Sequence, residues 1–230
     1  MIVDWFPRWN SLRIALISGV IVFFLGILAA NWIARLPGAV RAVADVVLTL
    51  PLVLPPTVCG YLLLLVFGVK RPLGALLASI GVKIVMNWWG GVLASVVVAF
   101  PLMYRTCRGA FHSFDETLAQ AGQTLGLGNT WIFWHVKLPA CRQGILAGFV
   151  LAFARALGEY GATSMLIGYT PGRTATISTT VYQLWRTNDE KGALMWVCMN
   201  LLISAVVLLC VSFLEGGQKK QRRETHGEGA

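Results

Sequence analysis

Apolar segments long enough to cross a lipid bilayer constrain this chain more than any other feature. Hydrophobic residues make up 57% of the sequence, charged residues only 13%, and the mean hydropathy is +0.69. A membrane-spanning helix needs about 20 predominantly apolar residues. The sequence therefore predicts an all-α integral membrane protein, with a membrane domain over residues 12–214 and about five transmembrane helices. The predicted spans are residues 12–34, 44–68, 88–107, 142–165 and 192–214.

The chain is basic, with 19 Lys and Arg against 10 Asp and Glu. The basic residues are spread thinly between the apolar segments, as is typical of membrane borders, and form no stripe that would predict nucleic-acid binding. Five cysteines and three histidines are scattered without ligand spacing. We therefore expect no nucleic-acid partner, no metal site and no catalytic residue in this chain.

The two ends and one connection of the chain differ from the predicted spans. Residues 1–11, with Trp5 and Trp9, are typical of an N-terminal interfacial segment. Residues 215–230 are rich in Lys and Arg and predict a cytoplasmic basic tail. Residues 73–86 are apolar but too short to cross, so either a re-entrant or a surface helix is expected there. Counting basic residues on the two sides of five spans does not settle the orientation.

Three prolines interrupt the second apolar segment, in the sequence Leu-Pro-Leu-Val-Leu-Pro-Pro-Thr. Each proline removes a backbone donor and crowds the carbonyl four residues earlier, so Pro51, Pro55 and Pro56 must kink or break a membrane helix. Carbonyls freed within the bilayer need another partner. Two interpretations stay open: a kink that serves packing, or an irregular segment including Pro55, Pro56 and Thr57 that lines a pathway through the membrane.

The fourth apolar segment contains a charged pair. Arg155 and Glu159 are four residues apart and so lie on one face of a helix. Charge at membrane depth costs several kcal/mol unless it is paired or hydrated. Either the pair fixes helix packing, or Arg155 faces a hydrated path while Glu159 moderates its field. The same segment carries Gly144-x-x-x-Gly148, a spacing that lets another helix approach closely.

The longest polar stretch, residues 113–139, lies between two apolar segments. Ser113 and Glu116 have the S-x-x-E spacing of a capping box, which predicts that a helix starts there. Gly126 suits the end of this helix, and Pro139 suits the first turn of the next. A short helix between two spans predicts a docking surface outside the bilayer. Small and apolar residues recur at helical spacing and form one face: Leu118, Ala121, Gly122 and Leu125.

This stretch resembles the "EAA" loop of ABC importer permeases, whose pattern E-A-A-x-x-x-G-A is followed after five residues by F-x-x-I-x-L-P. In that family the loop forms a cytoplasmic coupling helix that docks on the ATPase subunit. Gln120 replaces the acidic first residue, and Gly122 replaces the second alanine, which should loosen the helix by about 1 kcal/mol. The residues that the resemblance assigns to ATPase coupling are Gln120, Ala121, Gly122, Leu125, Gly126, Leu127, Phe133, Val136, Leu138 and Pro139.

Within that family the chain is most similar to the molybdate permeases. The proline-rich residues 50–64 are similar to their second core helix, and residues 171–177 resemble their outer loop. Residues 153–163 are similar to a segment that molybdate and sulfate permeases share. The resemblance extends from about residue 10 to residue 215 and implies a molybdate permease that works by alternating access in a bacterial inner membrane.

The resemblance also implies an orientation and a set of partners. The N-terminus is expected outside and the C-terminus in the cytoplasm. The implied partners are a second copy of this chain, two cytoplasmic ATPase subunits and a periplasmic or extracellular oxyanion-binding protein, besides the lipid bilayer. The chain has no G-x-x-x-x-G-K-[ST] phosphate loop, so ATP and Mg are expected on the ATPase subunits and no cofactor on this chain.

Two alternatives stay open at this point. A sulfate or tungstate permease would have the same architecture. A stand-alone channel or ion-coupled carrier that uses Arg155 and Glu159 would need no ATPase, and transport by the purified chain alone would favour it.

Overall fold

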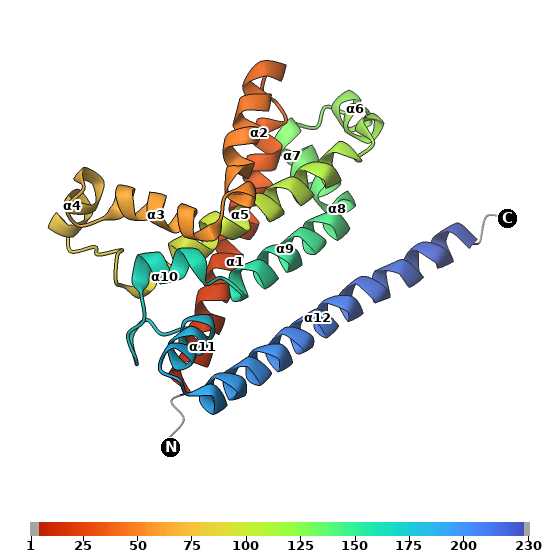
Figure 1. Ribbon diagram of the computed structural model, residues 1–230. Helices are drawn as coiled ribbons and strands as arrows, with labels where there is room; N and C mark the ends of the chain where they lie inside the picture. Colours follow the sequence, from red (N-terminus) through yellow and green to blue (C-terminus); the bar gives the residue numbers. More distant parts are fainter. Residues whose placement is uncertain (1–4, 228–230) are drawn as a thin grey trace.

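The part of the chain that the structure describes consists of helices joined by turns and irregular connections. The computed structural model describes residues 5–227, and their side chains over residues 5–209. Figure 1 shows a bundle from which α2, the α3–α4 region and α12 project in different directions. The elements are α1 (Phe6–Ile33), α2 (Gly38–Val53), α3 (Pro56–Phe67), α4 (Pro72–Ser79), α5 (Trp88–His112), α6 (Glu116–Thr124), α7 (Asn129–Ile132), the π-helix η1 (Phe133–Lys137), α8 (Leu138–Ala140), α9 (Arg142–Leu157), α10 (Gly161–Ile167), α11 (Ile177–Arg186) and α12 (Glu190–Gly227).

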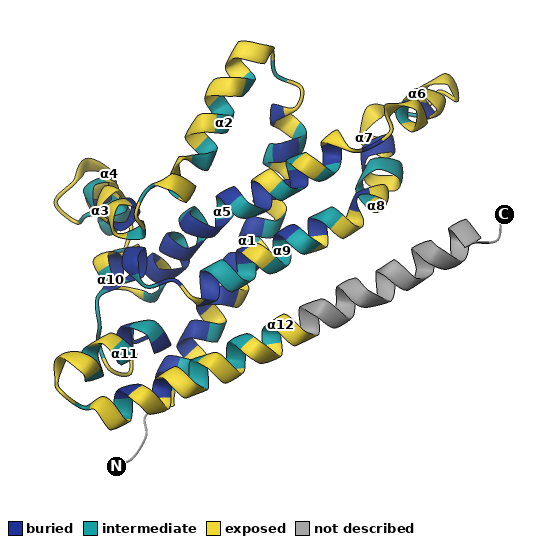
Figure 2. Ribbon diagram, turned by 45° about the vertical axis from the view of Figure 1, so that its right-hand side comes forward, coloured by how far each residue is buried: buried dark blue, intermediate teal, exposed yellow. Residues whose placement is uncertain are grey.

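Helices α1, α5 and α9 form the centre of the bundle, with α5 in extensive contact with both others. Figure 2 shows that α5 and α10 are largely buried, whereas α2 and the described part of α12 are not. Glycines on α9 make the α5 contact close: a Cβ at Gly144 would lie 2.6 Å from the Cβ of Ala110, and one at Gly148 would lie 2.9 Å from the Cβ of Thr106. The Gly-x-x-x-Gly spacing therefore does permit a close helix approach.

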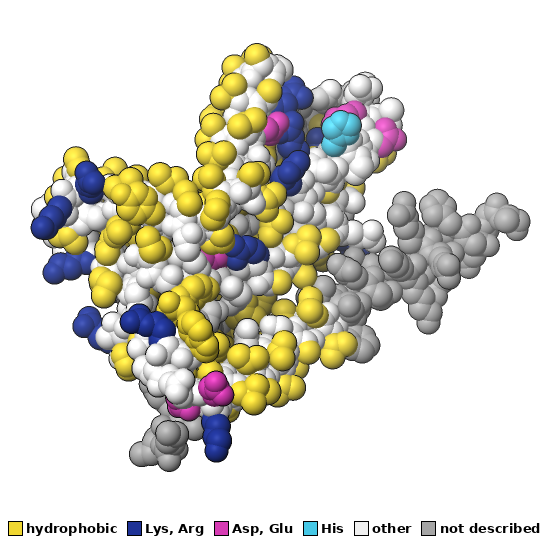
Figure 3. Space-filling view, viewed as in Figure 1, with side chains coloured by type: hydrophobic (Ala, Val, Ile, Leu, Met, Phe, Trp, Pro, Cys, Tyr) yellow, Lys and Arg dark blue, Asp and Glu magenta, His cyan; other side chains and the backbone are white. Residues whose placement is uncertain are grey.

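Among the residues that the structure describes, three helical segments are long and apolar enough to cross a membrane: Phe6–Ile33, Trp88–His112 and Glu190–Leu209. Two more spans result if each of two bent helix pairs counts as one, so the predicted number of five is the upper limit. Figure 3 shows hydrophobic side chains spread over α2 and the α3–α4 region, with Lys and Arg at the edges. Such a surface suits a lipid environment rather than water.

Both ends of the chain differ from the predicted boundaries. Helix α1 begins at Phe6, inside the predicted interfacial segment 1–11, because Pro7 lies in the first turn, where proline's fixed φ suits a helix. Helix α12 begins at Glu190 and its backbone continues to Gly227, through most of the predicted tail. The side chains of that tail, and residues 228–230 altogether, lie outside the described residues.

The second predicted span is two helices rather than one kinked helix. Helix α2 ends at Val53, α3 begins at Pro56, and the two axes differ by 114°. Pro55 precedes α3, and its carbonyl accepts hydrogen bonds from the backbone N–H groups of Val58 and Cys59 at 2.9 and 3.2 Å. The Pro-Pro pair therefore ends one helix and starts the next, which Pro51 inside α2 does not do.

The fourth predicted span, residues 142–165, is also interrupted, so the expectation of one continuous helix was wrong. Helix α9 ends at Leu157, and α10 begins at Gly161. Between them, residues 158–160 leave the helical path, and we refer to them as the 158–160 break. The short apolar stretch 73–86 starts inside the eight-residue helix α4, which begins at Pro72 and ends at Ser79, and continues as an irregular connection to α5.

The start of α1 and helix α11 lie together at the end of the bundle opposite α6 (Figure 1). The side-chain amide of Asn10 donates to the carbonyl of Ala175 at 2.9 Å, and the N–H of Ile177 donates to the hydroxyl of Ser11 at 2.8 Å. These hydrogen bonds attach the 168–176 connection to the N-terminal turns of α1.

Helix α3 approaches α10 so closely that only glycine fits at position 60, and this contact can be tested. A Cβ at Gly60 would lie 2.7 Å from the Cα of Ala162, whereas a Cβ at Gly109 in α5 would meet nothing within 4 Å. We expect Gly60→Ala to lower the free energy of unfolding by about 1–3 kcal/mol, because backbone must move. The matched change Gly109→Ala should be neutral or slightly stabilising.

Thermal unfolding of both variants in detergent measures the difference. Equal melting temperatures for the Gly60 and Gly109 variants would contradict the close contact between α3 and α10.

Candidate functional site

Two regions carry the predicted functional residues. The first is residues 113–139, which we call the central segment. Asp115, rather than Ser113, caps its helix α6: the Asp115 carboxylate accepts hydrogen bonds from the N–H and hydroxyl of Thr117 at 3.0 and 2.7 Å. These bonds lower the pKa of Asp115, so a negative charge is kept at the positive end of the helix dipole.

The capping-box prediction at Ser113 was therefore wrong. Helix α5 continues to His112, five residues beyond the predicted end at residue 107, and Ser113 follows it as its C-cap. The Ser113 hydroxyl donates backwards to the carbonyl of Ala110 at 2.9 Å and so belongs to the end of α5.

Gly126 ends α6 as the sequence predicted. Its φ of +78° lies in the left-handed region that favours glycine. The N–H of Leu127 donates to the carbonyl of Gly122 at 3.1 Å, and the N–H of Gly126 donates to that of Gln123 at 2.9 Å. This is the hydrogen-bond pattern of a Schellman motif.

Gly122 has a packing role that the sequence did not reveal. It is buried, and a Cβ there would lie 3.1 and 3.2 Å from side-chain carbons of Ile132 on α7. The glycine thus lets α6 pack directly on α7. Two polar contacts strengthen the attachment: Lys137 pairs with Glu116 at 3.0 Å, and the Gln123 amide donates to Asn129 at 3.0 Å.

Three of the four later motif residues pack on the bundle. Phe133 is buried, and its ring lies edge-on to Phe111 of α5, with centroids 5.9 Å apart. Val136 and Leu138 are half-buried and pack against the same core, while Pro139 is exposed. These residues fix the central segment to α5.

Apart from the buried Gly122, the earlier motif residues are mostly exposed. Gln120, Ala121 and Gly126 are exposed, and Leu125 is 79% exposed; Leu127 is half-buried. The α6 side of the central segment therefore presents a small apolar face, while its other side is fixed to the bundle. This division suits a helix that docks to a partner and transmits movement.

The second region is the 158–160 break. Arg155 Nη1 lies 2.6 Å from Glu159 Oε2, and Glu159 Oε1 accepts a hydrogen bond from the N–H of Ala162 at 2.7 Å. The Glu159 side chain is 1% exposed, whereas that of Arg155 is 30% exposed. One buried carboxylate thus neutralises the arginine and caps α10.

The proline-rich segment lies against this break. A Cβ at Gly161 would lie 2.9 Å from the Cβ of Pro56 and 3.0 Å from the N of Thr57. The structure therefore places Pro56 and Thr57 against the first residue of α10, two residues after Glu159 in the chain, so the predicted pathway residues Pro55, Pro56 and Thr57 lie in the same region as the Arg155–Glu159 pair.

A further polar cluster joins α2 to α5. Asp45 forms an ion pair with Arg108 and accepts a hydrogen bond from the Tyr104 hydroxyl; Arg108 also donates to that hydroxyl at 3.1 Å. The sequence analysis did not single out Asp45, although an acidic residue in an apolar segment was a usable signal.

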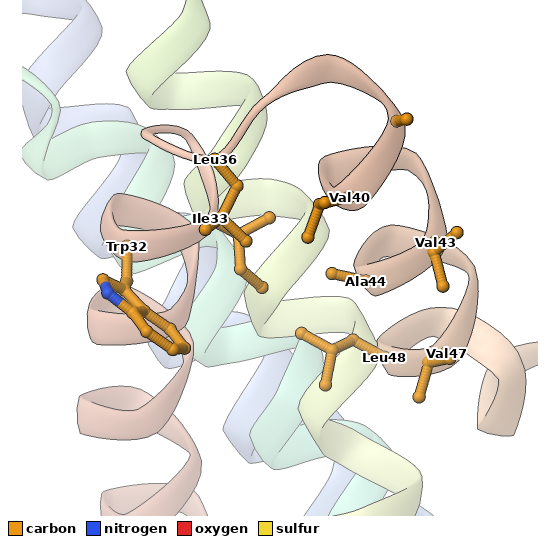
Figure 4. A pocket seen from close by; sticks show the side chains of 9 residues that line it. Trp32, Ile33, Leu36, Val40, Val43, Ala44, Val47 and Leu48 are labelled. Atoms are coloured by element: carbon orange, nitrogen blue, oxygen red, sulfur yellow. The ribbon is translucent and has the colours of Figure 1, made fainter.

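This cluster holds α2 beside an apolar groove. Figure 4 shows side chains of α1 and α2 lining the groove from both sides, including Trp32, Val40 and Val47, and its volume is about 580 Å³. Helix α2 is therefore held to the bundle by this polar cluster and by Ala44 and Leu48, which pack against the core, and none of its residues is fully buried.

Comparisons with known proteins agree with this architecture. The Molybdenum transport system permease protein ModB of Escherichia coli (strain K12) is 39% identical over 211 residues, covering 90% of this chain and 92% of the relative. ModB of Haemophilus influenzae is 37% identical over 203 residues, covering 88% and 89%. A structure of the MetNI methionine ABC transporter in an inward-facing conformation has a TM-score of 0.74 at 12% identity, covering 92% of this chain and 94% of that chain.

A family model agrees with these relatives. It is described as "Binding-protein-dependent transport system inner membrane component" and matches residues 22–220. With the identities above, this match shows that the chain belongs to the family of binding-protein-dependent transport system inner membrane components.

Proposed function

We propose that this chain is the permease subunit of an ATP-driven molybdate importer and forms the translocation path by alternating access. The observation that carries the proposal is the identity of 37–39%, over nearly the whole chain, to relatives named as molybdenum transport permeases. Because this chain would supply the path and not the energy, ATP and Mg belong on a partner ATPase subunit. The complex contains two copies of the chain, two ATPase subunits and an external oxyanion-binding protein.

The proposed orientation places α6 in the cytoplasm of a bacterial cell, at the inner membrane. The start of α1 and helix α11 lie at the opposite end of the bundle, so the N-terminus is outside, where α11 and the 168–176 connection face the binding protein (Figure 1). Helix α12 then returns towards the cytoplasmic side.

Coupling to the ATPase follows from how α6 is held. Its exposed face, with Leu118, Ala121 and Leu125, docks on the ATPase subunit. Movement of α6 passes through the Lys137–Glu116 pair and the Gly122 contact with Ile132 into the part of the central segment that packs on α5. Gln120 offers a neutral hydrogen bond where the family pattern has a charge.

The 158–160 break supplies the anion-facing part of the path. Arg155 is partly exposed and attracts an oxyanion, while Glu159 reduces its net field. An arginine without an acidic partner at membrane depth would bind the anion strongly. The paired arginine binds it weakly enough to release it.

The substrate is tested by the ATPase activity of the reconstituted complex. We expect binding protein loaded with molybdate to stimulate ATP hydrolysis more than binding protein loaded with sulfate or tungstate. Stronger stimulation by sulfate or tungstate would favour the corresponding permease instead. Oxyanion uptake by the purified chain alone, without ATP, would contradict the importer proposal and indicate a channel or carrier.

The coupling role of α6 predicts different effects at two neighbouring glycines. Gly126 has a φ of +78°, whereas Gly128 has a φ of −70° with open space around it. We expect Gly126→Val to disturb the end of α6, because a branched residue is strained at positive φ, and to reduce uptake at least tenfold while ATP hydrolysis continues. Gly128→Val should leave uptake within about twofold of wild type.

Uptake into proteoliposomes and ATP hydrolysis, measured together, separate these outcomes. Unchanged uptake in the Gly126 variant would contradict the coupling assignment.

The anion-facing role of Arg155 predicts a graded effect at position 159. Glu159→Gln keeps an oxygen that accepts from the N–H of Ala162 but leaves the arginine charge unbalanced, so we expect tighter oxyanion binding and slower uptake. Glu159→Ala also removes the cap of α10, and should lower stability by a further ~1 kcal/mol. Uptake rate and melting temperature of the two variants check this.

Adding Arg155→Gln to Glu159→Gln serves as the control, because both charges are then removed. If Glu159→Gln alone transports like the wild type, the proposed balance of charge at the break is incorrect.

A further inference from the structure

A cavity of about 390 Å³ lies between α1, the end of the central segment and α9. Phe24 and Leu28 line it from α1, Trp134 from η1, and Leu146 from α9. These four side chains are between 42% and 56% exposed, so the cavity is open to its surroundings. Its volume is within the range of sites that bind small apolar ligands, about 300–1,000 Å³.

Among the side chains that the structure describes, Arg142 is the one charged residue that lines this cavity, and it lies at the first position of α9. Trp134 lines the same cavity, and tryptophan is typical of the level of lipid headgroups. Arg142 is exposed and forms no ion pair with any residue whose side chain the structure describes. Three other basic residues of the bundle do form ion pairs, Arg108 with Asp45, Lys137 with Glu116, and Arg155 with Glu159, so what sets Arg142 apart is its place in the lining of an apolar cavity.

We propose that this cavity binds an acyl chain of an anionic phospholipid whose phosphate lies at the Arg142 guanidinium. An apolar surface without a cavity would contact the acyl chains of any lipid. A cavity that holds one acyl chain next to an unpaired cation at the headgroup level favours an anionic lipid. The inference depends on the proposed placement of the start of α9 at the membrane border, and not on which oxyanion is carried.

The site would also act on the central segment. The Trp134 ring lies 5.4 Å from that of Phe133, the residue that fixes this segment to α5. An acyl chain packed on Trp134 would therefore stabilise the position of Phe133, and with it the part of the central segment that packs on α5.

Native mass spectrometry of the full complex in detergent, with phosphatidylglycerol or phosphatidylcholine added, tests the proposal. We expect phosphatidylglycerol to be retained by the wild type, and about fivefold more weakly by Arg142→Gln, because one cation near the headgroup is lost. Arg105→Gln is the matched control, since Arg105 is an exposed arginine of α5 that does not line the cavity. It should retain phosphatidylglycerol like the wild type.

A second variant separates lipid from other occupants. Leu146→Trp reduces the cavity without changing charge, and should also lower phosphatidylglycerol retention. Equal retention by the wild type, Arg142→Gln and Leu146→Trp would overturn the proposal, as expected if another part of the complex fills the cavity. Displacement of the lipid by equimolar inorganic phosphate would overturn it too, because it would indicate a free-anion site.

Discussion

The shared use of the Glu159 carboxylate is the interaction on which the membrane part of this structure depends. Inside a bilayer, backbone groups released by a broken helix must find partners, and an unpaired charge is costly. Glu159 meets both requirements, because one oxygen accepts from the N–H of Ala162 and the other pairs with Arg155. The break can therefore exist in an apolar segment, and α10 can start in a direction that brings it against α3.

Helix α9 connects the two regions that carry function. It begins at Arg142, separated by two residues from the end of the central segment, and ends at Leu157, directly before the 158–160 break. Its glycine-lined contact with α5 is close, and α5 also carries Phe111, on which Phe133 packs. A displacement of α6 can therefore be transmitted through the packed contacts of the central segment, α5 and α9 to the residues proposed to face the anion, because closely packed interiors transmit strain.

Spacing in the sequence predicted much of this arrangement. Apolar length indicated the spans, and the position of Gly126 predicted the end of a helix, whereas the packing of Phe133 on the bundle was not predicted. The 158–160 break was missed because Gly158 and Glu159 occur in a run whose overall composition is that of one span. Ser113 was assigned to the wrong helix because its spacing to Glu116 fits a cap, whereas nothing local shows that α5 continues to His112.

Pairings between distant segments could not be predicted from one sequence. Asp45 and Arg108 lie in different helices, and their pairing depends on how α2 leans on α5. Similarly, the need for glycine at position 122 comes from Ile132, which only the folded chain brings near. The local sequence pattern therefore identifies candidate functional residues more readily than it identifies which residues contact one another in the fold.

The most direct test of the account is a cross-link from α6 to the ATPase subunit. A photoreactive residue at Leu125, in membranes that contain the co-expressed ATPase, should give a product containing that subunit. The same residue at Gly172, in the 168–176 connection at the opposite end, should give none. A product from Gly172 but not from Leu125 would contradict the proposed orientation, and no product from either would contradict docking through α6.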